Sequence, residues 1–218
     1  HKAVHPDAEQ AADGTLRISA QGGYVVADRH KHLYRDDVFP RTPNMMTPDE
    51  VVRHKPAWAE CFAMKTSETA RKILDALKSG SQEEIRARAQ MMAAVDEGLG
   101  AIFEVLERQG ELDNTFVVFA SDNGFFFGEH ALGPERRFAY EEGIRSPFLV
   151  RYPRRVKAGT RLRDLVICQD IAPTMIELAG GKPGPQIQGR SLLPLFARGS
   201  KPARSGSRAG WRKSFLVE

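Results

Sequence analysis

An aspartate and an asparagine stand side by side where a strongly apolar stretch of the sequence ends. Residues 115–120 form a run of strand length, and Asp122 and Asn123 follow it closely, before Gly124. A carboxylate beside an amide carbonyl offers two hard oxygen donors, the ligands that calcium and magnesium prefer. The pair therefore predicts a divalent-cation site, whereas an Asx turn after a strand is the alternative that this tripeptide alone favours.

Imidazole and guanidinium side chains follow this pair in the next segment. His130 ends the sequence Gly-Glu-His, and Arg136 and Arg137 come shortly after it. Guanidinium groups bind anionic groups through paired hydrogen bonds, and an imidazole can accept or donate a proton near neutral pH. These residues fit a site that binds an anionic ester beside a cation, although His130 taken singly is more often a polar loop residue.

A further histidine with catalytic potential lies near the beginning of the chain. His5 precedes Pro6, which restricts the backbone there, and it could act as a general acid for a leaving alcohol. The alternative for His5 is an ordinary surface histidine. Three others match no metal-ligand spacing and are expected to be structural: His30, His32 and His54. A GxSxG elbow and a Walker loop are both absent from the sequence, so a Ser-His-Asp triad is not predicted.

Helical periodicity is clearest between Ser81 and Gly110. Ser81 and Glu84 have the spacing of a capping box, and Gly110 is a plausible C-terminal stop. The pattern predicts one buried apolar stripe, with Arg86 and Arg88 on the exposed face. The stripe consists of Ile85, Met92, Val95, Leu99, Ile102, Phe103 and Leu106.

Two apolar runs, 115–120 and 147–152, predict buried parallel strands because they are apolar on both faces. Shorter helices are expected at 28–34, 67–79, 170–180 and 191–196. Asp170 is the predicted cap of the third of these, with Met175 facing inward, and Ser191 is the predicted cap of the fourth. Helices alternating with buried strands predict an α/β fold, in which ligands bind at the carboxyl ends of the strands.

Composition and charge are those of a globular chain with an excess of cations. The 218 residues are 41% hydrophobic and 28% charged, with a net charge of +4, and the cations gather in 151–163 and 198–213. This favours a solvated basic surface, or attraction for an anionic substrate such as a sulfated sugar, over nucleic-acid binding, for which no motif is present. No apolar run approaches the roughly 18 residues of a membrane span. Cys61 and Cys168 match no zinc or CxxC spacing and are expected to be buried free thiols.

Several of these segments occur in the order in which the sulfatase family has them. They are Asp113 to Gly124, Gly128-Glu129-His130, Tyr140 to Pro147, Val150 to Pro153, Asp170 to Thr174, and Gln188 to Leu192. The opening His1 to Pro6, with Arg29-His30 and Leu33-Tyr34, is similar to sulfatases that act on glycosaminoglycan or mucin-type sugars. The chain therefore resembles a sulfatase of the alkaline-phosphatase-like superfamily, nearest to N-acetylglucosamine-6-sulfatase-like members, over nearly its whole length.

The resemblance implies a fold and an activity. The expected fold is part of the alkaline-phosphatase-like three-layer α/β sandwich with a mainly parallel sheet. Residues 1–197 would belong to the catalytic domain, and residues 198–218 would be a linker and the start of a C-terminal element. The expected activity is calcium-dependent hydrolysis of sulfate esters on sulfated sugars, with magnesium as the alternative cation. Family members are commonly periplasmic, secreted or lysosomal.

The same resemblance assigns roles to individual residues. Asp122 and Asn123 would bind the metal, and His5 and Arg136 would be catalytic. Substrate binding would fall to Lys2, His130 and Arg137. The family usually has a lysine at the place of Arg136. Because arginine does not readily give up a proton, His5 is the stronger candidate for the acid.

The family's nucleophile is a formylglycine made from the Cys or Ser of a Cys/Ser-x-Pro-x-Arg motif, which lies before the region covered here. Neither Cys61 nor Cys168 fits the motif. Residues 200–204 match its bare pattern but follow the expected metal-ligand strand, so we interpret them as a chance match. The chain is therefore expected to be an internal fragment that is inactive alone. The alternatives are a phosphodiesterase or phosphonate hydrolase of the same superfamily, and a non-catalytic sugar-binding pseudo-enzyme.

Overall fold

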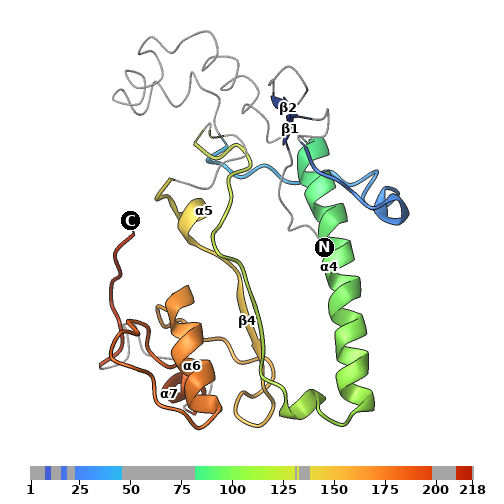
Figure 1. Cartoon of the computed structure of the whole chain (residues 1–218). Helices are drawn as coiled ribbons and strands as arrows, with labels where there is room; N and C mark the ends of the chain where they lie inside the picture. Colours follow the sequence, from blue (N-terminus) through green and yellow to red (C-terminus); the bar gives the residue numbers. More distant parts are fainter. Residues whose placement is uncertain are drawn as a thin grey trace. The chain divides into compact units, whose positions relative to one another are not determined.

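The computed structural model of the chain describes residues 8–10, 16–18, 23–45, 82–130, 132, 138–197 and 210–217 (Figure 1). It divides into two units, each with its own contacts. The first unit comprises His1–Val105 and Gly124–Ile144, and the second comprises Leu106–Asn123 and Arg145–Glu218. The helix predicted at 67–79, residues 198–209 of the predicted linker and Cys61 lie outside the described residues. Among the described helices, none has the length and apolar composition that crossing a membrane would require.

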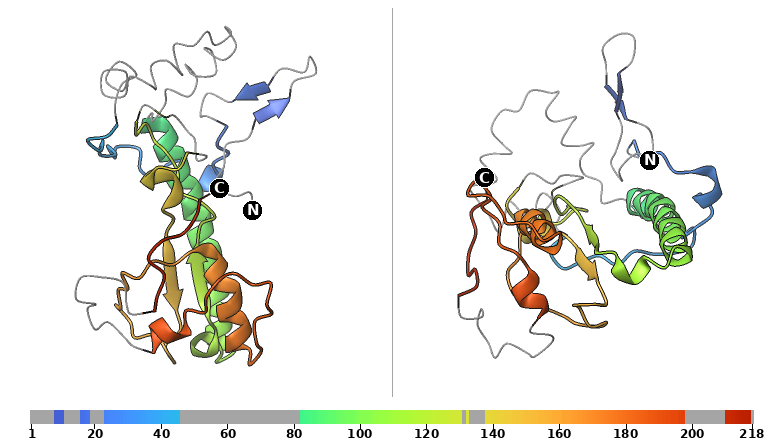
Figure 2. Two further views of the ribbon diagram at one scale, coloured as in Figure 1. Left: turned by 90° about the vertical axis from the view of Figure 1, so that its left-hand side faces the viewer. Right: turned by 60° about the horizontal axis from the view of Figure 1, so that its bottom comes forward.

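The first unit contains a strand pair, a short turn of helix and most of a long helix. Strands β1 (Ala8–Gln10) and β2 (Leu16–Ile18) pair antiparallel, as Figure 2 shows. The 3-10 helix η1 (Asp28–His30) lies where a short helix was expected. The one-turn helix α5 spans Glu141–Ile144.

The long helix α4 (Gln82–Arg108) confirms the helix predicted from the periodicity. It ends at Gly110, whose φ of 70° is a left-handed conformation that residues with a side chain rarely adopt. There the amide of Gly110 donates to the carbonyl of Glu107 at 2.9 Å, and the amide of Glu111 donates to the carbonyl of Leu106 at 2.8 Å. These bonds satisfy carbonyls of the last turn that have no partner further along the helix.

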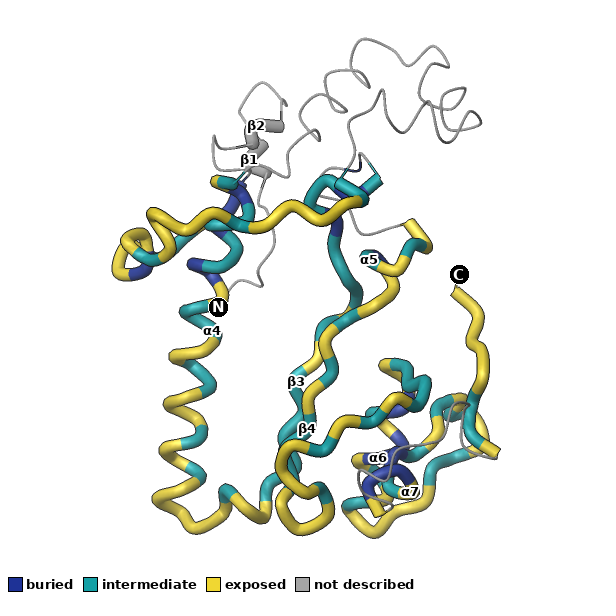
Figure 3. The backbone as a smooth tube through the Cα atoms, turned by 180° about the vertical axis from the view of Figure 1, so that it is seen from behind, coloured by how far each residue is buried: buried dark blue, intermediate teal, exposed yellow. Residues whose placement is uncertain are grey.

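The predicted burial of α4 is wrong in part. Its buried residues are Glu84, Ala87, Gln90 and Met91, all in the first turns, whereas Met92 and Ile102 of the predicted stripe are exposed. Figure 3 shows the same change along the helix, from buried positions near its start to largely exposed positions later. The physical reason lies in the irregular segment 23–45, whose backbone binds polar side chains of α4.

Three polar residues at four-residue spacing on α4 hold this segment. Gln82 exchanges two hydrogen bonds with the backbone of Phe39, at 2.7 and 3.0 Å. Arg86 donates to the carbonyl of Tyr34 at 2.8 Å, and Gln90 donates to that of Leu33 at 2.8 Å. Residues four apart lie on one helical face, so this face is polar because it satisfies the backbone of a segment without regular structure.

The second unit is built around strands β3 (Val117–Ala120) and β4 (Phe148–Arg151). It also contains the 3-10 helices η2 (Leu112–Asn114) and η3 (Cys168–Asp170) and the helices α6 (Ile171–Leu178) and α7 (Leu193–Phe196). The expectation that β3 and β4 are buried parallel strands is wrong: they pair antiparallel, from Val117 opposite Arg151 to Ala120 opposite Phe148. A parallel pair needs a crossover, usually a full helix, whereas the described part of this connection holds only the single turn α5.

One face of the β3–β4 pair packs on the apolar core of this unit. The buried centre of that core is Leu192, Leu195 and Phe196 from α7 and the residue before it. Partly buried side chains pack around it: Phe116, Phe148, Val150, Val156, Leu162, Val166, Leu193 and Trp211. The other face is open, since Leu149 is 64% exposed. The amide of Leu193 donates to the Ser191 hydroxyl at 3.3 Å, but Leu192 occupies the N-cap position of α7 without a side-chain capping bond, so the predicted cap by Ser191 is wrong. Met175 of α6 is exposed rather than inward.

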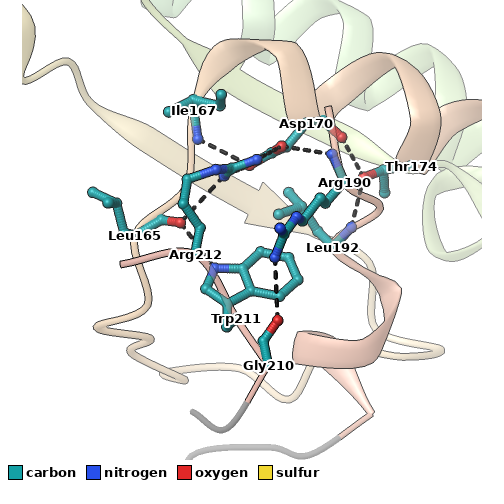
Figure 4. Close-up of polar contacts among 9 residues, drawn as sticks. All are labelled: Leu165, Ile167, Asp170, Thr174, Arg190, Leu192, Gly210, Trp211 and Arg212. Atoms are coloured by element: carbon teal, nitrogen blue, oxygen red, sulfur yellow. Dashed lines mark hydrogen bonds and ion pairs between the residues drawn. The ribbon is translucent and has the colours of Figure 1, made fainter. Parts of the chain in front are cut away.

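A buried ion pair joins the segment 210–217 to the start of α6 (Figure 4). Asp170 is fully buried, and its carboxylate accepts from both terminal nitrogens of Arg212, at 2.6 and 2.8 Å. It also accepts from the amides of Ile167 at 3.0 Å and Arg190 at 2.8 Å. The side chain makes no capping bond to α6, so the predicted cap role is wrong. The carboxylate instead binds three separate segments.

This arrangement also explains the ionisation of Asp170. Burial raises the pKa of the Asp170 carboxyl, but the hydrogen bonds from Arg212, Arg190 and Ile167 outweigh burial and hold the pKa below its usual value. Next to this pair, the indole nitrogen of Trp211 donates to the carbonyl of Leu165 at 2.8 Å. Residues 210–217 form no helix or strand, but they are anchored in the second unit by this pair and this bond.

Candidate metal and substrate site

Strand β3 ends at Ala120, and Asp122 and Asn123 follow it after one residue, Ser121. Asp122 is exposed, and one of its carboxylate oxygens accepts from the amide of Asn123 at 3.0 Å and from the hydroxyl of Ser121 at 3.4 Å. The carboxylate therefore stabilises its own turn, as the alternative of an Asx turn predicts. An ionised carboxylate has about four acceptor positions, so this turn leaves capacity for a cation.

The donor types at this turn fit a hard cation. Calcium takes about 6–8 oxygen ligands, and Asp122 and Asn123 offer a carboxylate and an amide oxygen. Within the described residues there is no group of three or more His, Cys, Asp or Glu side chains that could hold a metal ion. The pair offers two of the oxygen ligands that such a cation needs.

Cys168 lies beside the end of β3. Its thiol donates weakly to the carbonyl of Ser121, with a sulfur–oxygen distance of 3.6 Å, and the residue is exposed. The expectation of a buried thiol is therefore wrong for Cys168. The apolar neighbours that suggested burial lie before η3 and at the start of α6, whereas Cys168 itself is exposed.

His130 lies in the first unit, in a cluster with three polar or aromatic partners. Its Nε2 lies 3.2 Å from a carboxylate oxygen of Glu142, whose other oxygen accepts from the side-chain amide of Asn44. The imidazole stacks on the ring of Tyr140, with centroids 4.3 Å apart and planes 20° from parallel. The amide of His130 donates to the carbonyl of Asn44 at 2.7 Å. Backbone and side chain of His130 are thus both fixed.

The charge of Glu142 determines which nitrogen of His130 carries a proton. Burial raises the pKa of Glu142, but its own backbone amide, the charge and hydrogen bond of His130, and the Asn44 amide together lower it below its usual value. The carboxylate is therefore ionised near neutral pH and can only accept. Because a carboxylate accepts and an imidazole nitrogen must then donate, Nε2 of His130 carries the hydrogen of this pair.

Tight packing sets the distance between the loop of His130 and α5. Phe126 is fully buried and meets Tyr140 edge-on, with centroids 6.2 Å apart. A side chain at Gly143 would place its Cβ 2.3 Å from the carbonyl oxygen of Phe138, so only glycine fits there. The amide of Gly124 donates to the carbonyl of Gly143 at 2.8 Å. These contacts bring Glu142 to His130.

An arginine from α4 holds the aromatic loop from the other side. The guanidinium of Arg88 lies 3.7 Å from the ring centroid of Phe125 and 5.3 Å from that of Phe127. Arg88 also donates to the hydroxyl of Tyr24 at 3.1 Å, and this hydroxyl donates to Glu84 at 2.9 Å. Burial raises the pKa of Tyr24 to about 12. Arg88 was expected on the exposed face, but it is half-buried among aromatic rings.

The remaining histidine with described partners is structural, as expected. His30 is buried, and its Nε2 lies 2.6 Å from a carboxylate oxygen of Glu97. Arg29 donates to the other oxygen of Glu97 at 2.7 and 2.9 Å. The hydrogen bonds from Arg29 and His30 lower the pKa of Glu97 to about 2. This pair fastens η1 to α4.

The structure therefore describes three of the seven predicted site residues. Asp122 and Asn123 are adjacent in the second unit, and His130 lies in the first. The other four lie outside the described residues, and their roles stay predictions: Lys2, His5, Arg136 and Arg137. Sequence reasoning missed Asn44 as a partner of Glu142, because 98 residues separate the two and no local pattern joins them.

Comparisons with known proteins identify the family of this chain. The sulfatase family model matches residues 25–181. An N-acetylglucosamine-6-O-sulfatase of Bacteroides thetaiotaomicron is 36% identical over 193 residues, which cover 84% of this chain and 33% of that protein. The chain thus spans about a third of the length of this curated relative.

Solved structures agree with the family model. One, a protein in complex with its substrate D-glucosamine-2-N,6-O-disulfate, has a TM-score of 0.64 and 27% identity, and covers 87% of this chain and 47% of its own. A phosphonate monoester hydrolase from Silicibacter pomeroyi shares the fold, with a TM-score of 0.59 at 19% identity over 87% of this chain and 36% of its own. The predicted alkaline-phosphatase-like fold class is confirmed. The chain belongs to the sulfatase family.

Proposed function

We propose that this chain is a segment of a calcium-dependent sulfatase that hydrolyses sulfate esters on sulfated sugars. The observation that carries the proposal is the 36% identity, over 84% of the chain, to an N-acetylglucosamine-6-O-sulfatase. A solved relative that binds D-glucosamine-2-N,6-O-disulfate supports the same substrate class. The nucleophile, a formylglycine in this family, would come from outside the 218 residues, and the chain alone would release no sulfate.

Asp122 and Asn123 would hold the calcium ion through their side-chain oxygens. The turn at the end of β3 supports this role, because it exposes the Asp122 carboxylate while fixing one of its oxygens through the amide of Asn123. When bound, the cation would supply positive charge that stabilises the negative charge of a sulfate group. A neutral asparagine beside the carboxylate keeps the site from excess negative charge as an anionic ester approaches.

His130 would bind the substrate through an imidazole whose orientation is set in advance. Glu142 accepts from Nε2, and Tyr140 limits rotation of the ring by stacking. A pre-oriented donor or acceptor needs no reorganisation when the substrate arrives, which is the main source of its effect on rate. By resemblance, Lys2 and Arg137 would bind the sulfated sugar, His5 would protonate the leaving oxygen, and Arg136 would pair with the sulfate.

Two other functions compete with this one. The fold is shared with a phosphonate monoester hydrolase, so the fold alone does not decide between sulfate and phosphonate esters. A non-catalytic sugar-binding protein is the second alternative, and the arginine at 136 in place of the usual lysine is the feature that favours it. The protein would act in the periplasm, outside the cell or in the lysosome, where family members commonly act.

Activity of the full-length protein on N-acetylglucosamine-6-sulfate tests the proposal. We expect calcium-dependent sulfate release, and a decrease of at least about 100-fold in kcat/KM for Asp122→Ala, since loss of a charge-stabilising group typically costs that much. Asp113→Ala is the matched control, because Asp113 is an exposed carboxylate of the same unit, and it forms an ion pair with Arg151. Equal rates for the two variants would contradict the metal assignment. Faster turnover of phosphonate than sulfate esters would favour the first alternative.

A further inference from the structure

A basic loop follows β4 in the second unit. We define it as residues 153–163, and Figure 1 shows it leaving the end of β4. It contains five exposed cations and no acidic residue: Arg154, Arg155, Lys157, Arg161 and Arg163. Among the described residues none of these five forms an ion pair, whereas Arg151 and Arg212 of the same unit are each paired with an aspartate.

The apolar residues of the basic loop fix the direction of its cations. Val156 and Leu162 pack against the buried core of the second unit. The amides of Arg155 and Val156 both donate to the carbonyl of Tyr152, at 2.9 and 2.8 Å, and that of Thr160 donates to the carbonyl of Lys157 at 3.2 Å. The loop is therefore held down at two points and turned by its own backbone bonds, which leaves the cations between these anchors facing solvent.

From this arrangement we propose that the basic loop is a docking surface for a sulfated polysaccharide chain, separate from the sugar whose sulfate is cleaved. The inference rests on the proposed function for the identity of the partner. Arginine pairs with sulfate-like anions through two parallel hydrogen bonds, which favours it over lysine at such a surface. Each exposed pair is weak alone, but contacts along a polyanion add together through the counterions they release.

The position of the basic loop explains why it would touch a different part of the substrate. In the β3–β4 register, Ala120 and Phe148 lie at the end that leads to Asp122, whereas Val117 and Arg151 lie at the end that leads to the loop. Four-residue strands are about 13 Å long at about 3.3 Å per residue, so one sugar ring does not span this separation. Docking on the loop should therefore strengthen binding of long chains and leave monosaccharides unaffected.

Charge alone would also attract nucleic acid, but the loop lacks the side chains that single strands use. Stacking of bases on aromatic rings is the second component of such binding. Residues 153–163 contain no aromatic residue, and Tyr152, which precedes them in the sequence, is engaged edge-on with Phe116, with centroids 5.8 Å apart. The surface therefore fits a polymer recognised by its anionic groups rather than by its rings.

The test compares two variants of the 218-residue chain that have equal net charge. The loop variant carries Arg154→Ser, Arg155→Ser, Lys157→Ser and Arg161→Ser. The control variant loses four exposed cations that lie elsewhere, by Arg35→Ser, Arg108→Ser, Lys182→Ser and Lys213→Ser. Each variant falls from a net charge of +4 to 4 − 4 = 0. All eight positions are exposed, and circular dichroism checks that both variants fold.

Dissociation constants for a heparin decasaccharide, measured by calorimetry over a range of salt, give the decisive comparison. We expect at least tenfold weaker binding for the loop variant, with the slope of log K against log salt reduced by about 3 for four lost charges. The control should keep the slope and lose less than threefold. Equal losses of affinity in the two variants would overturn the proposal. It would also be overturned if binding of N-acetylglucosamine-6-sulfate alone depended on the loop.

Two further measurements separate this inference from others. A single-stranded oligonucleotide of equal charge should bind more weakly than the decasaccharide, and equal or tighter loop-dependent binding would overturn the choice of a sulfated partner. Sulfate release from N-acetylglucosamine-6-sulfate by the full-length protein tests the proposed function without the loop. If that release is absent while heparin binding still depends on the loop, the docking surface stands and the catalytic proposal fails. If sulfate is released but heparin binding does not depend on the loop, only the docking surface is overturned.

Discussion

Replacing Arg212 by methionine should destabilise the second unit strongly, although Arg212 follows a segment that the sequence marks as a linker. The Arg212 side chain is 9% exposed, and its guanidinium donates two hydrogen bonds to the fully buried carboxylate of Asp170. Methionine keeps much of the aliphatic bulk but removes both donors and the positive charge. Asp170 would then be a buried negative charge without a cation.

The size of the effect follows from what remains around the carboxylate. Breaking one partner of a buried ion pair costs about 3–5 kcal/mol, because the other charge stays buried. The amides of Ile167 and Arg190 still donate to Asp170 in the variant, so the lower end, about 3 kcal/mol, applies. For a chain of this size the midpoint of thermal unfolding should fall by about 6–12 °C.

The variant should also change the dependence of stability on pH. In the native protein the pKa of Asp170 lies below its usual value, so the carboxylate contributes stability above the ordinary pKa, near 3.8, and this contribution is lost as pH falls through the lower native pKa. Without Arg212, burial becomes the dominant influence and raises the pKa of Asp170. The difference in stability between native protein and variant should therefore shrink as the solution is acidified.

Urea denaturation followed by tryptophan fluorescence measures this, since Trp211 lies next to Arg212 in the same core. The control is Arg151→Met: Arg151 pairs with Asp113, but their side chains are 35% and 74% exposed, so its loss should cost about 1 kcal/mol or less. A smaller loss for Arg212→Met than for Arg151→Met would refute the reasoning. So would additive effects of Arg212→Met and Asp170→Asn, because partners in direct contact must show coupling.

Three other substitutions test the first unit. Glu142→Gln removes the charged acceptor of His130, so kcat/KM of the full-length protein should fall about tenfold. The nitrogen chemical shifts of the imidazole should also show that Nε2 is no longer the preferred site of the hydrogen, and unchanged shifts would contradict the positioning role. Gly143→Ala forces a Cβ to within 2.3 Å of the Phe138 carbonyl and should cost about 1–3 kcal/mol of unfolding free energy, and full stability in thermal melts would contradict the packing. Glu97→Gln should be less stable than the native protein above about pH 4.5. The difference in stability should close toward pH 2, because the pKa of Glu97 is lowered from 4.5 to about 2. A difference that does not change with pH in a denaturation series would argue against the Arg29 pairing.

The elements that the sequence predicts well are those set by local interactions. Helix α4 runs from Gln82 to Arg108, within the predicted bounds, because helical periodicity and Gly110 are local signals, whereas Ser81 of the predicted capping box lies outside the described residues. Helix α7 (Leu193–Phe196) lies within the predicted range 191–196, although Ser191 is not its cap. These signals act over a few residues, so they can be read without knowledge of the tertiary structure.

Burial and strand direction were predicted less well, since both depend on distant segments. Gln90 is buried because it binds the carbonyls of Lys31 and Leu33, which lie almost 60 residues away, and a hydrophobic pattern cannot show such a partner. Apolar residues on both faces of β3 suggested a covered parallel strand. The antiparallel partner β4 leaves one face open instead, as the exposed Leu149 shows.

The candidate site, too, could be predicted from the sequence only in part. Asp122 and Asn123 could be identified from sequence, because a strand end followed by oxygen ligands is a local pattern. The surroundings of His130 could not, since they combine Asn44, Glu142 and Tyr140 from separate segments. Resemblance to a family predicts a role for His130, and the three-dimensional structure adds Glu142 as the partner that orients its imidazole.

The chain anchors its two sets of candidate site residues in different cores, although they are neighbours in sequence. Asp122 and Asn123 follow β3, whose partner strand β4 packs on the α7 core, and the chain passes to the first unit at Gly124. From there Arg88 and the ring of Phe126 fix the loop that carries His130. A substitution in one core should therefore disturb one set and spare the other. For this reason a loss of activity from Gly143→Ala would report on the imidazole, whereas a loss from Asp122→Ala would report on the metal, and the two contributions to the proposed sulfatase chemistry can be separated by experiment.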